Sequence, residues 1–264
     1  MTNDLLKDKT AWIVGAAGAI GHATALRFAM YGAAVVLSGR NEDNLKRLAD
    51  EFESQAMPRP AIVPVDITSR ESVDSGAQAA ISALGKVDIL INSTTNPIFA
   101  DFMDLTDEDW MAVMDAKAFG YMRTARAILP HFKKNGGGTI INVSGRGGHQ
   151  PTSPSHLAGS LANGAVNTLT KGLANMYGGD GIRVNAVAPG PVKSERYDRI
   201  AKANQLVSDT MKLKPRPGTG TDNSLGYMSG PNEIADTIAF LASDMSRFMT
   251  GETLRIDGGG TVAT

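Results

Sequence analysis

The chain has 264 residues, no cysteine and a formal net charge of −1 at pH 7, and 42% of its residues are hydrophobic. This balance gives no basic face for nucleic acid, and the lack of cysteine excludes disulfides, thiolate metal sites and a cysteine nucleophile. No apolar run approaches the roughly 20 residues of a membrane span, and the first residues lack a signal-peptide pattern. We therefore expect a soluble, cytoplasmic protein without a nucleic-acid partner, a membrane partner or a metal site.

Short β-branched runs alternate with segments of helical periodicity along the chain. Strands are expected at residues 12–14, 35–37, 62–65, 87–91, 139–143, 182–187 and 253–256, and helices at residues 22–31, 42–52, 71–84, 108–132, 161–177 and 231–243. Strands this apolar, separated by helices, imply a parallel sheet that is covered on both faces. Right-handed crossovers then give a doubly wound α/β fold.

A glycine turn follows the first strand and opens the first helix. Residues 15–21 read Gly-Ala-Ala-Gly-Ala-Ile-Gly. Glycine permits backbone angles and close approaches that a Cβ would block, and the free N–H groups at a helix start attract phosphate. The turn is therefore suited to the pyrophosphate of a dinucleotide. The alternative is that its glycines serve only tight packing of the strand against the helix.

One segment breaks the alternation between the sixth strand and the last helix. Residues 193–229 are polar and contain methionine and a Lys-Pro-Arg-Pro-Gly stretch. We interpret this segment as a mobile lid over the ligand site. The alternative is an ordinary excursion of the chain over the surface.

Several further segments occur in an order that is typical of one family. They are Asp-Ile-Thr at 66–68, Asp-Ile-Leu-Ile-Asn at 88–92, Ile-Asn-Val-Ser at 141–144, Arg-Val-Asn-Ala-Val-Ala-Pro-Gly at 183–190 and Gly-Glu-Thr-Leu-Arg-Ile-Asp-Gly-Gly at 251–259. Together they resemble the classical short-chain dehydrogenase/reductase family over essentially the whole chain. The resemblance implies a single Rossmann-type domain over residues 1–264 with a seven-stranded parallel sheet. It also implies a small-molecule substrate and a homotetramer or homodimer.

The resemblance further implies a nicotinamide cofactor at the carboxyl ends of the strands. The positions that match the family's cofactor contacts are Gly15, Gly18, Ile20, Gly21, Asp66, Ile67, Asn92, Pro189, Gly190, Val192 and Ser194. After the second strand, Gly39 and Arg40 stand where an acid would bind the ribose diol of NAD. The planar guanidinium of Arg40 suits a 2′-phosphate, so we predict NADP(H). The alternative is that Arg40 is a solvated charge.

The family's catalytic Asn, Ser, Tyr and Lys do not carry over to this chain. Their aligned positions hold Lys117, Gly145, Gly159 and Asn163. A positioned general acid–base is worth roughly 10²–10⁴ in rate, so the expected chemistry changes. The candidate replacements are Lys117, Ser144, Ser160 and His156, with Asn163 at the usual lysine position and Arg146 and His149 on the same loop. The loop residues could equally be solvated side chains, and Lys117 could equally have no catalytic role.

Three functions follow from these observations. The first is an NADP(H)-dependent oxidoreductase with non-standard proton chemistry, acting on an activated alkene or a carbonyl compound. The second is a catalytically silent NADP(H)-binding protein or sensor subunit. The third is a non-redox enzyme, such as a lyase or hydrolase, that reuses the pocket. We favour the first.

Overall fold

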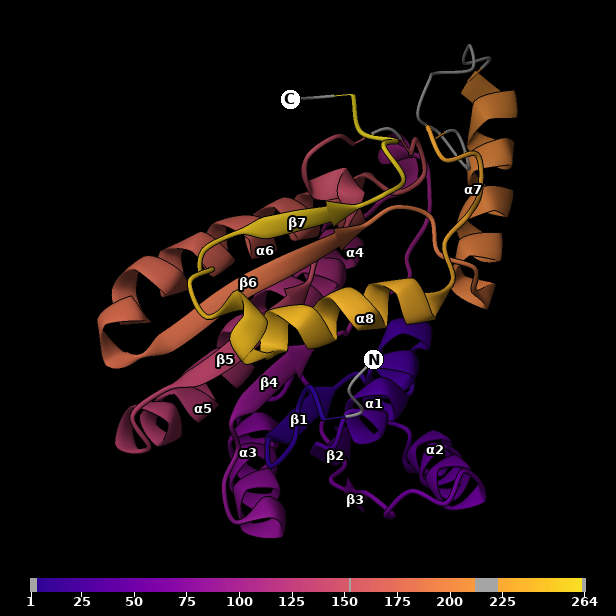
Figure 1. The fold of residues 1–264 in the computed structure, drawn as a ribbon. Helices are drawn as coiled ribbons and strands as arrows, with labels where there is room; N and C mark the ends of the chain where they lie inside the picture. The colour runs from indigo at the N-terminus through magenta and orange to yellow at the C-terminus, as the bar shows by residue number, and fades with distance from the viewer. Residues whose placement is uncertain (1–3, 152, 212–222, 263–264) are drawn as a thin grey trace.

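The computed structural model describes residues 4–151, 153–211 and 223–262. Its centre is a parallel seven-stranded sheet with the strand order β3-β2-β1-β4-β5-β6-β7 (Figure 1). The strands are β1 Thr10–Val14, β2 Ala34–Ser38, β3 Ala61–Ile62, β4 Ile89–Asn92, β5 Gly138–Val143, β6 Ile182–Pro189 and β7 Thr253–Ile256. The strand order changes direction between β1 and β4, where ligands of doubly wound sheets bind. The predicted fold class is confirmed.

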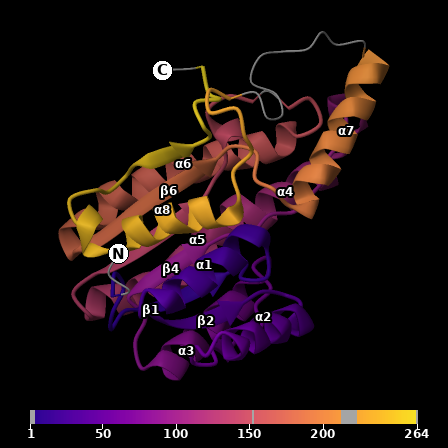
Figure 2. The same ribbon diagram turned by 45° about the vertical axis from the view of Figure 1, so that its right-hand side comes forward.

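Helices cover both faces of the sheet (Figures 1 and 2). They are α1 Ala19–Met30, α2 Glu42–Ser54, α3 Arg70–Leu84, α4 Asp107–Met114, α5 Gly120–Lys134, α6 Leu157–Tyr177, α7 Glu195–Met211 and α8 Pro231–Ala242. α1, α2 and α8 share one core, and α3, α5 and α6 share another. In both views α7 stands apart from these layers, beyond the carboxyl ends of the central strands.

Alternation along β1 shows why both faces must be covered. Ile13 belongs to the core under α1, α2 and α8, whereas Trp12 and Val14 belong to the core under α3, α5 and α6. Successive side chains of a strand point to opposite faces, so a continuous apolar run needs an apolar layer on each side. The indole N–H of Trp12 is satisfied within the sheet, because it donates to the Ser38 hydroxyl at 2.8 Å.

The third strand is shorter than the predicted 62–65. β3 ends at Ile62, although the amides of Val63 and Val65 still donate to carbonyl oxygens of residues 37 and 39. Pro64 lies between them and has no N–H to give to the ladder. The expectation of a regular strand over this range was wrong for that reason.

The single helix predicted over 108–132 is interrupted. α4 ends at Met114, a π-helical turn follows over Asp115–Phe119, and α5 then begins at Gly120. Gly120 packs tightly on Ile67, because an added Cβ would lie 2.7 Å from its side chain. π-Helical turns inside helices occur frequently at functional sites. Apolar periodicity predicts that a segment is helical, but it does not by itself distinguish one continuous α-helix from two helices joined by a π-helical turn.

The segment predicted as a lid contains a helix that the sequence reading missed. The Ser194 hydroxyl accepts from the Tyr197 amide at 3.2 Å and so caps the first turn of α7. The Pro-containing part that dominated our interpretation, residues 214–218, lies outside the described residues.

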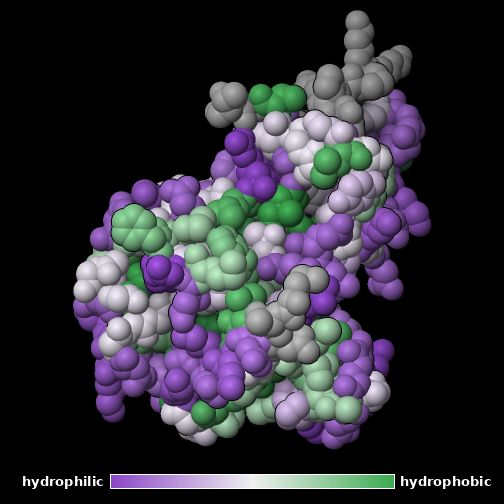
Figure 3. Space-filling view, viewed as in Figure 1, coloured by the Kyte–Doolittle hydropathy of each residue, from purple (hydrophilic) through white to green (hydrophobic). Residues whose placement is uncertain are grey.

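Hydrophilic and hydrophobic residues are interspersed over the face that carries α8 (Figure 3). Among the described residues, no helix has both the length and the apolar character that a membrane span requires.

Candidate active site

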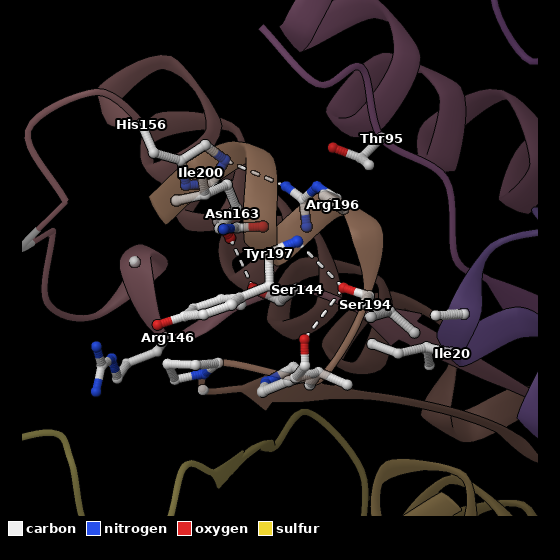
Figure 4. Close-up of a pocket in the computed structure, with 18 of the residues that line it drawn as sticks. Ile20, Thr95, Ser144, Arg146, His156, Asn163, Ser194, Arg196, Tyr197 and Ile200 are labelled. Atoms are coloured by element: carbon white, nitrogen blue, oxygen red, sulfur yellow. Dashed lines mark hydrogen bonds between the residues drawn. The ribbon is translucent and has the colours of Figure 1, made fainter. Parts of the chain in front are cut away.

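A cavity of about 620 Å³ opens at the carboxyl ends of the central strands. Its wall is built from the glycine turn, the segments after β4, β5 and β6, the π-helical turn and the starts of α6 and α7 (Figure 4). The carboxyl ends of parallel strands meet at one edge, so these segments converge although they are far apart in sequence. A volume of this size is typical of small-molecule and cofactor sites.

The predicted cofactor residues divide into two groups. The first group lines the cavity and comprises Gly18, Ile20, Pro189, Gly190, Val192 and Ser194. The second group lies outside its wall and comprises Gly15, Gly21, Arg40, Asp66, Ile67 and Asn92. The cavity therefore reaches part of the glycine turn, at Gly18 and Ile20, and the positions matched to the nicotinamide. Arg40, Asp66 and Ile67, which are matched to the adenosine half, lie beyond it.

The glycine turn leaves helix amides open. α2 and α3 are capped by the Asn41 and Ser69 side chains, whereas α1 follows Gly18 without a side-chain cap. Gly15 has φ 88° and an added Cβ there would lie 2.6 Å from the Ser93 carbonyl oxygen, so the fold itself requires this glycine. At Gly18 a Cβ would make only an ordinary contact of 3.5 Å. Glycine at this position is thus free to serve close approach by a ligand, and open amides at a helix start suit an anion.

Arg40 is exposed just after β2, and its positive charge stabilises the ionised form of Asp66, which follows β3. Burial alone would raise the pKa of Asp66, but hydrogen bonds from Thr68, with the positive charges of Arg40 and Arg123, hold the pKa below its usual value. The Thr68 hydroxyl donates to the Asp66 carboxylate at 2.7 Å. Arg40 and Asp66 therefore mark one polar edge next to the glycine turn.

Asn92 lies under the cavity floor rather than in its wall. Its amide donates to the Asn142 side chain at 2.9 Å, and its oxygen accepts from the Thr124 hydroxyl at 2.8 Å. Asn142 in turn donates to Thr170 at 3.0 Å. The fully buried Asn92 side chain thus ties β4 to β5, α5 and α6, and only its backbone is left for a ligand.

Lys117 projects from the π-helical turn into the cavity wall. Its amine donates to the Val143 carbonyl at 2.8 Å and makes longer contacts of 3.5 Å with the Thr94 carbonyl and the Tyr121 hydroxyl. Burial, together with the nearby charge of Arg196, lowers the pKa of Lys117 to about 7. Lys117 thus stays a candidate for the replacement chemistry, with a charge that depends on pH near neutrality. Near neutral pH the amine can both hold and release a proton.

Tyr121 packs against the Lys117 amine and shares its carbonyl partners. Its hydroxyl lies between the Thr94 and Val143 carbonyl oxygens at 3.0 and 3.1 Å, and the Lys117 amine lies 5.2 Å from its ring centroid. The side chain is fully buried, and burial raises the pKa of its phenol. Tyr121 is thus a positioning residue that stays protonated, and the sequence reading passed over it.

His156 fills the space beside Gly159. A Cβ added at Gly159 would overlap the His156 ring, and the ring Nε2 lies 3.2 Å from an Arg196 nitrogen. Burial, and then the charges of Arg196 and Lys117, lower the pKa of His156 to about 3. The imidazole is therefore neutral near pH 7, so the prediction of His156 as a proton donor is corrected.

Asn163 and Ser144 form a second neutral pair in the wall. An added Cβ at Gly145 would lie 2.7 Å from the Asn163 amide nitrogen, so this amide fills the space beside Gly145. The Ser144 hydroxyl donates to the Asn167 side chain at 2.6 Å and also lies 3.1 Å from the Asn163 carbonyl oxygen. Both side chains line the cavity and offer hydrogen bonds without charge.

Ser160 also lines the cavity, but its hydroxyl donates to the His156 carbonyl one helical turn earlier at 3.0 Å. Arg146 is buried, and Figure 4 shows the Tyr197 phenol extending toward it. His149, the other loop candidate, does not line the cavity and lies 3.4 Å from the Asn167 amide. The structure thus brings Lys117, Ser144, Ser160, His156 and Asn163 to one cavity.

The start of α7 adds residues that our sequence reading did not single out. Arg196 and Tyr197 line the cavity, and the Arg196 guanidinium carbon lies 5.8 Å from the Phe99 ring centroid. The arginines at 196 and 199 share a helix face at a spacing of three, and both lie against Phe99. That spacing is the only sequence signal that could have identified them.

Comparisons with known proteins cover almost the whole chain. The family model described as "Enoyl-(Acyl carrier protein) reductase" matches residues 15–261. A glucose 1-dehydrogenase of Gluconobacter oxydans is 35% identical over 266 residues, covering 98% of this chain and 94% of that protein.

Two solved structures, of a reductase and a dehydrogenase, also resemble this chain over nearly its whole length. The L-sorbose reductase of Gluconobacter frateurii, solved with NADPH and L-sorbose, superposes with a TM-score of 0.87 at 28% identity over 99% of this chain and 100% of its own. A 7 alpha-hydroxysteroid dehydrogenase solved with NADH and 7-oxo glycochenodeoxycholic acid gives a TM-score of 0.85 at 27% identity, over 100% and 98% of the two chains. The protein therefore belongs to the classical short-chain dehydrogenase/reductase family of oxidoreductases.

Proposed function

We propose that this protein is an NADP(H)-dependent oxidoreductase with a non-standard active site, which reduces an activated alkene or carbonyl compound. Family membership supports the redox class, and the two solved relatives were determined with NADPH and with NADH. The observation that carries the proposal is the position of Lys117, whose amine lines the same cavity as the glycine turn. A bound nicotinamide would supply the hydride.

The chain's residues fit such a cofactor. The open amides after Gly18 would hold the pyrophosphate, and Ser194 with the segment 189–192 would hold the nicotinamide amide. Arg40 would pair with the 2′-phosphate through its planar fork. Asp66 and Ile67 would border the adenine. Gly18 is the structural feature that favours a bound ligand: the fold tolerates a Cβ at this position, so packing alone does not require a glycine there.

Lys117 suits an enolate better than an isolated alkoxide. Reduction of a simple ketone needs complete proton transfer to the oxygen as the hydride arrives. The neutral His156 and Asn163 do not supply that proton, which leaves the transfer to a Lys117 ammonium that is only partly populated near pH 7. Reduction of a conjugated alkene places negative charge on a carbonyl oxygen, which a positioned ammonium or N–H group can hold. Lys117 makes one short hydrogen bond and two long ones, so turning an N–H toward a substrate oxygen gives up little.

A second candidate function is a catalytically silent NADP(H)-binding protein. The feature that favours it is that Gly159 and Asn163 hold the positions aligned with the family's tyrosine and lysine, and neither is an acid. The His156 ring, which fills the space beside Gly159, is neutral near pH 7. The start of α7 lines the cavity in either case, and we propose that it serves as the lid over the bound ligand in a single-domain protein.

The test is NADPH consumption with matched substrates. Purified protein is supplied with NADPH and either 2-cyclohexenone or cyclohexanone, and loss of the reduced-nicotinamide absorbance is followed. Faster turnover of the enone supports the reductase. Faster ketone reduction would overturn the alkene preference, and tight NADPH binding without turnover over a broad panel would favour the silent binder.

A further inference from the structure

The α7 side of the cavity carries positive charge that no carboxylate balances. Lys117 and Arg196 both line the cavity. Burial lowers the pKa of each, and neither pKa is shifted by an Asp or Glu carboxylate. The acidic side chain in the lining is Glu195, which is exposed. Among the described residues, no ion pair joins either cation to a carboxylate.

Arg196 is held in place by neutral groups. One of its terminal nitrogens lies 3.2 Å from His156 Nε2, and its guanidinium carbon lies 5.8 Å from the Phe99 ring centroid. The rings of Phe99 and His156 are themselves 5.4 Å apart. The Arg196 Nε is buried and has no hydrogen-bond partner in the described part of the chain. The Arg196 guanidinium is thus held in place by its neighbours, and its Nε–H group remains without an acceptor among the described residues.

The neutral contacts leave the charge of Arg196 uncompensated. Because the imidazole of His156 is neutral near pH 7, its Nε2 accepts the hydrogen bond and adds no negative charge. Removing a cation from water without a partner is costly, and buried polar atoms are nearly always hydrogen-bonded. A site with these properties is completed by an anion. The planar fork of arginine matches a carboxylate in particular.

We propose that the substrate carries a carboxylate that binds Arg196, while its reducible group lies toward Lys117. This inference rests on the proposed reductase, because it names the substrate class of the same cavity. In Figure 4, a dashed line joins Arg196 to His156 at the start of α6, and Ser194 is drawn between Arg196 and Ile20 of the glycine turn. That placement favours a substrate group over the cofactor's pyrophosphate as the ligand of Arg196.

A carboxylate at Arg196 would also act on Lys117. The charge of Arg196 contributes to the low pKa of the Lys117 amine. A bound anion offsets that charge and raises the Lys117 pKa, so the ammonium form is more populated when substrate is present. Binding and proton supply are then coupled in one cavity.

The test compares an acid with its ester. Calorimetry on the NADP⁺ complex uses levulinate and methyl levulinate as probes, which bind without turnover because the cofactor is oxidised. Kinetics with NADPH use (E)-4-oxopent-2-enoate and its methyl ester. The variants are Arg196→Leu and Arg196→Lys, and the matched control is Arg199→Leu, on the same helix and also against Phe99 but outside the cavity wall.

We expect levulinate to bind roughly 10- to 100-fold more tightly than its ester, as a charge-assisted hydrogen bond implies. Arg196→Leu should abolish this preference, Arg196→Lys should keep part of it, and Arg199→Leu should keep it. Equal binding of acid and ester in the wild type would overturn the inference even if both enones are reduced. A large loss of NADPH affinity in Arg196→Leu would also overturn it, because the arginine would then serve the cofactor. Selective levulinate binding without any turnover would support the anion site and count against the reductase alone.

Discussion

The imidazole of His156 occupies the space into which a side chain at Gly159 would project. Position 159 aligns with the family's tyrosine. In this chain the His156 side chain, at the end of the loop before α6, packs into the space that the glycine at 159 leaves open on α6. A tyrosine side chain at position 159 would therefore clash with the His156 ring before it could reach a substrate. The histidine and the glycine form one structural unit.

This contact predicts that the effect of Gly159→Ala on the free energy of unfolding changes sign when the His156 side chain is removed. Gly159→Ala should destabilise the wild type by roughly 1–3 kcal/mol, because the added methyl overpacks against His156. In a His156→Ala background the same change should stabilise by up to about 1 kcal/mol, since alanine is the better helix former. Urea unfolding of the four proteins measures the coupling. Gly172→Ala, at a site on α6 with nothing within 4 Å of the new Cβ, is the control and should stabilise in both backgrounds. Additive effects at 156 and 159 would contradict the packing account.

The exposed Arg40 predicts cofactor selectivity. A charge-assisted contact to the 2′-phosphate is worth about 1.5–3 kcal/mol, which is roughly 10- to 100-fold in affinity. Calorimetry should show NADPH binding tighter than NADH by that factor. Arg40→Ala should remove the difference, and Arg47→Ala, an exposed arginine on the neighbouring α2, should leave it unchanged. Tighter NADH binding by the wild type would refute the selectivity.

The sheet could be predicted from sequence because its signal is local. β-Branched runs such as β1 and β5 and the helices between them are specified by periodicity, and the turn at Gly15 by its glycines. What the sequence could not show depends on contacts between distant elements. The pKa of Lys117 follows from its burial and then from the charge of Arg196, and the neutrality of His156 follows from its burial and then from the charges of Arg196 and Lys117.

The role of α7 could not be predicted for a similar reason. Its helix is marked by the cap at Ser194, but a lone serine before polar residues is a weak signal amid a segment that ends in prolines. Arg196 became identifiable only when the fold brought it against Phe99 and His156, which come from segments after β4 and before α6.

Lys117→Met should stabilise the protein, and more at low pH than at high pH. The folded-state pKa of Lys117, lowered by burial and by Arg196 to about 7, lies below the usual 10.5. Between these values the unfolded state binds more protons, so the lysine's cost to folding is largest below pH 7 and falls as pH rises toward 10.5. The gain from the substitution should be larger at pH 6 than at pH 9 by on the order of 2 kcal/mol. Denaturation midpoints at the two pH values measure it, and a pH-independent gain would argue against a depressed pKa.

We expect a homo-oligomer formed through α4, α5 and α6. Within a single chain, Ala118 is buried and Leu169 is half-buried, whereas Met111 on α4 and Leu161 on α6 are exposed. Light scattering should give a multiple of 27.7 kDa. Leu161→Glu should shift the mass toward the monomer, and Met245→Glu, at an exposed methionine after α8, should not. A wild-type mass of 27.7 kDa at micromolar concentration would exclude this assembly.

The central claim is that the Lys117 amine holds or protonates the substrate oxygen during reduction. The most direct measurement is the single-turnover rate of NADPH oxidation by a neutral enone, 2-cyclohexenone, as a function of pH. We predict that the rate falls as pH rises through about 7, that Lys117→Met lowers it by about 10²-fold or more, and that Lys134→Met, on the exposed end of α5, leaves it unchanged. A Lys117→Met protein as fast as the wild type would contradict the account.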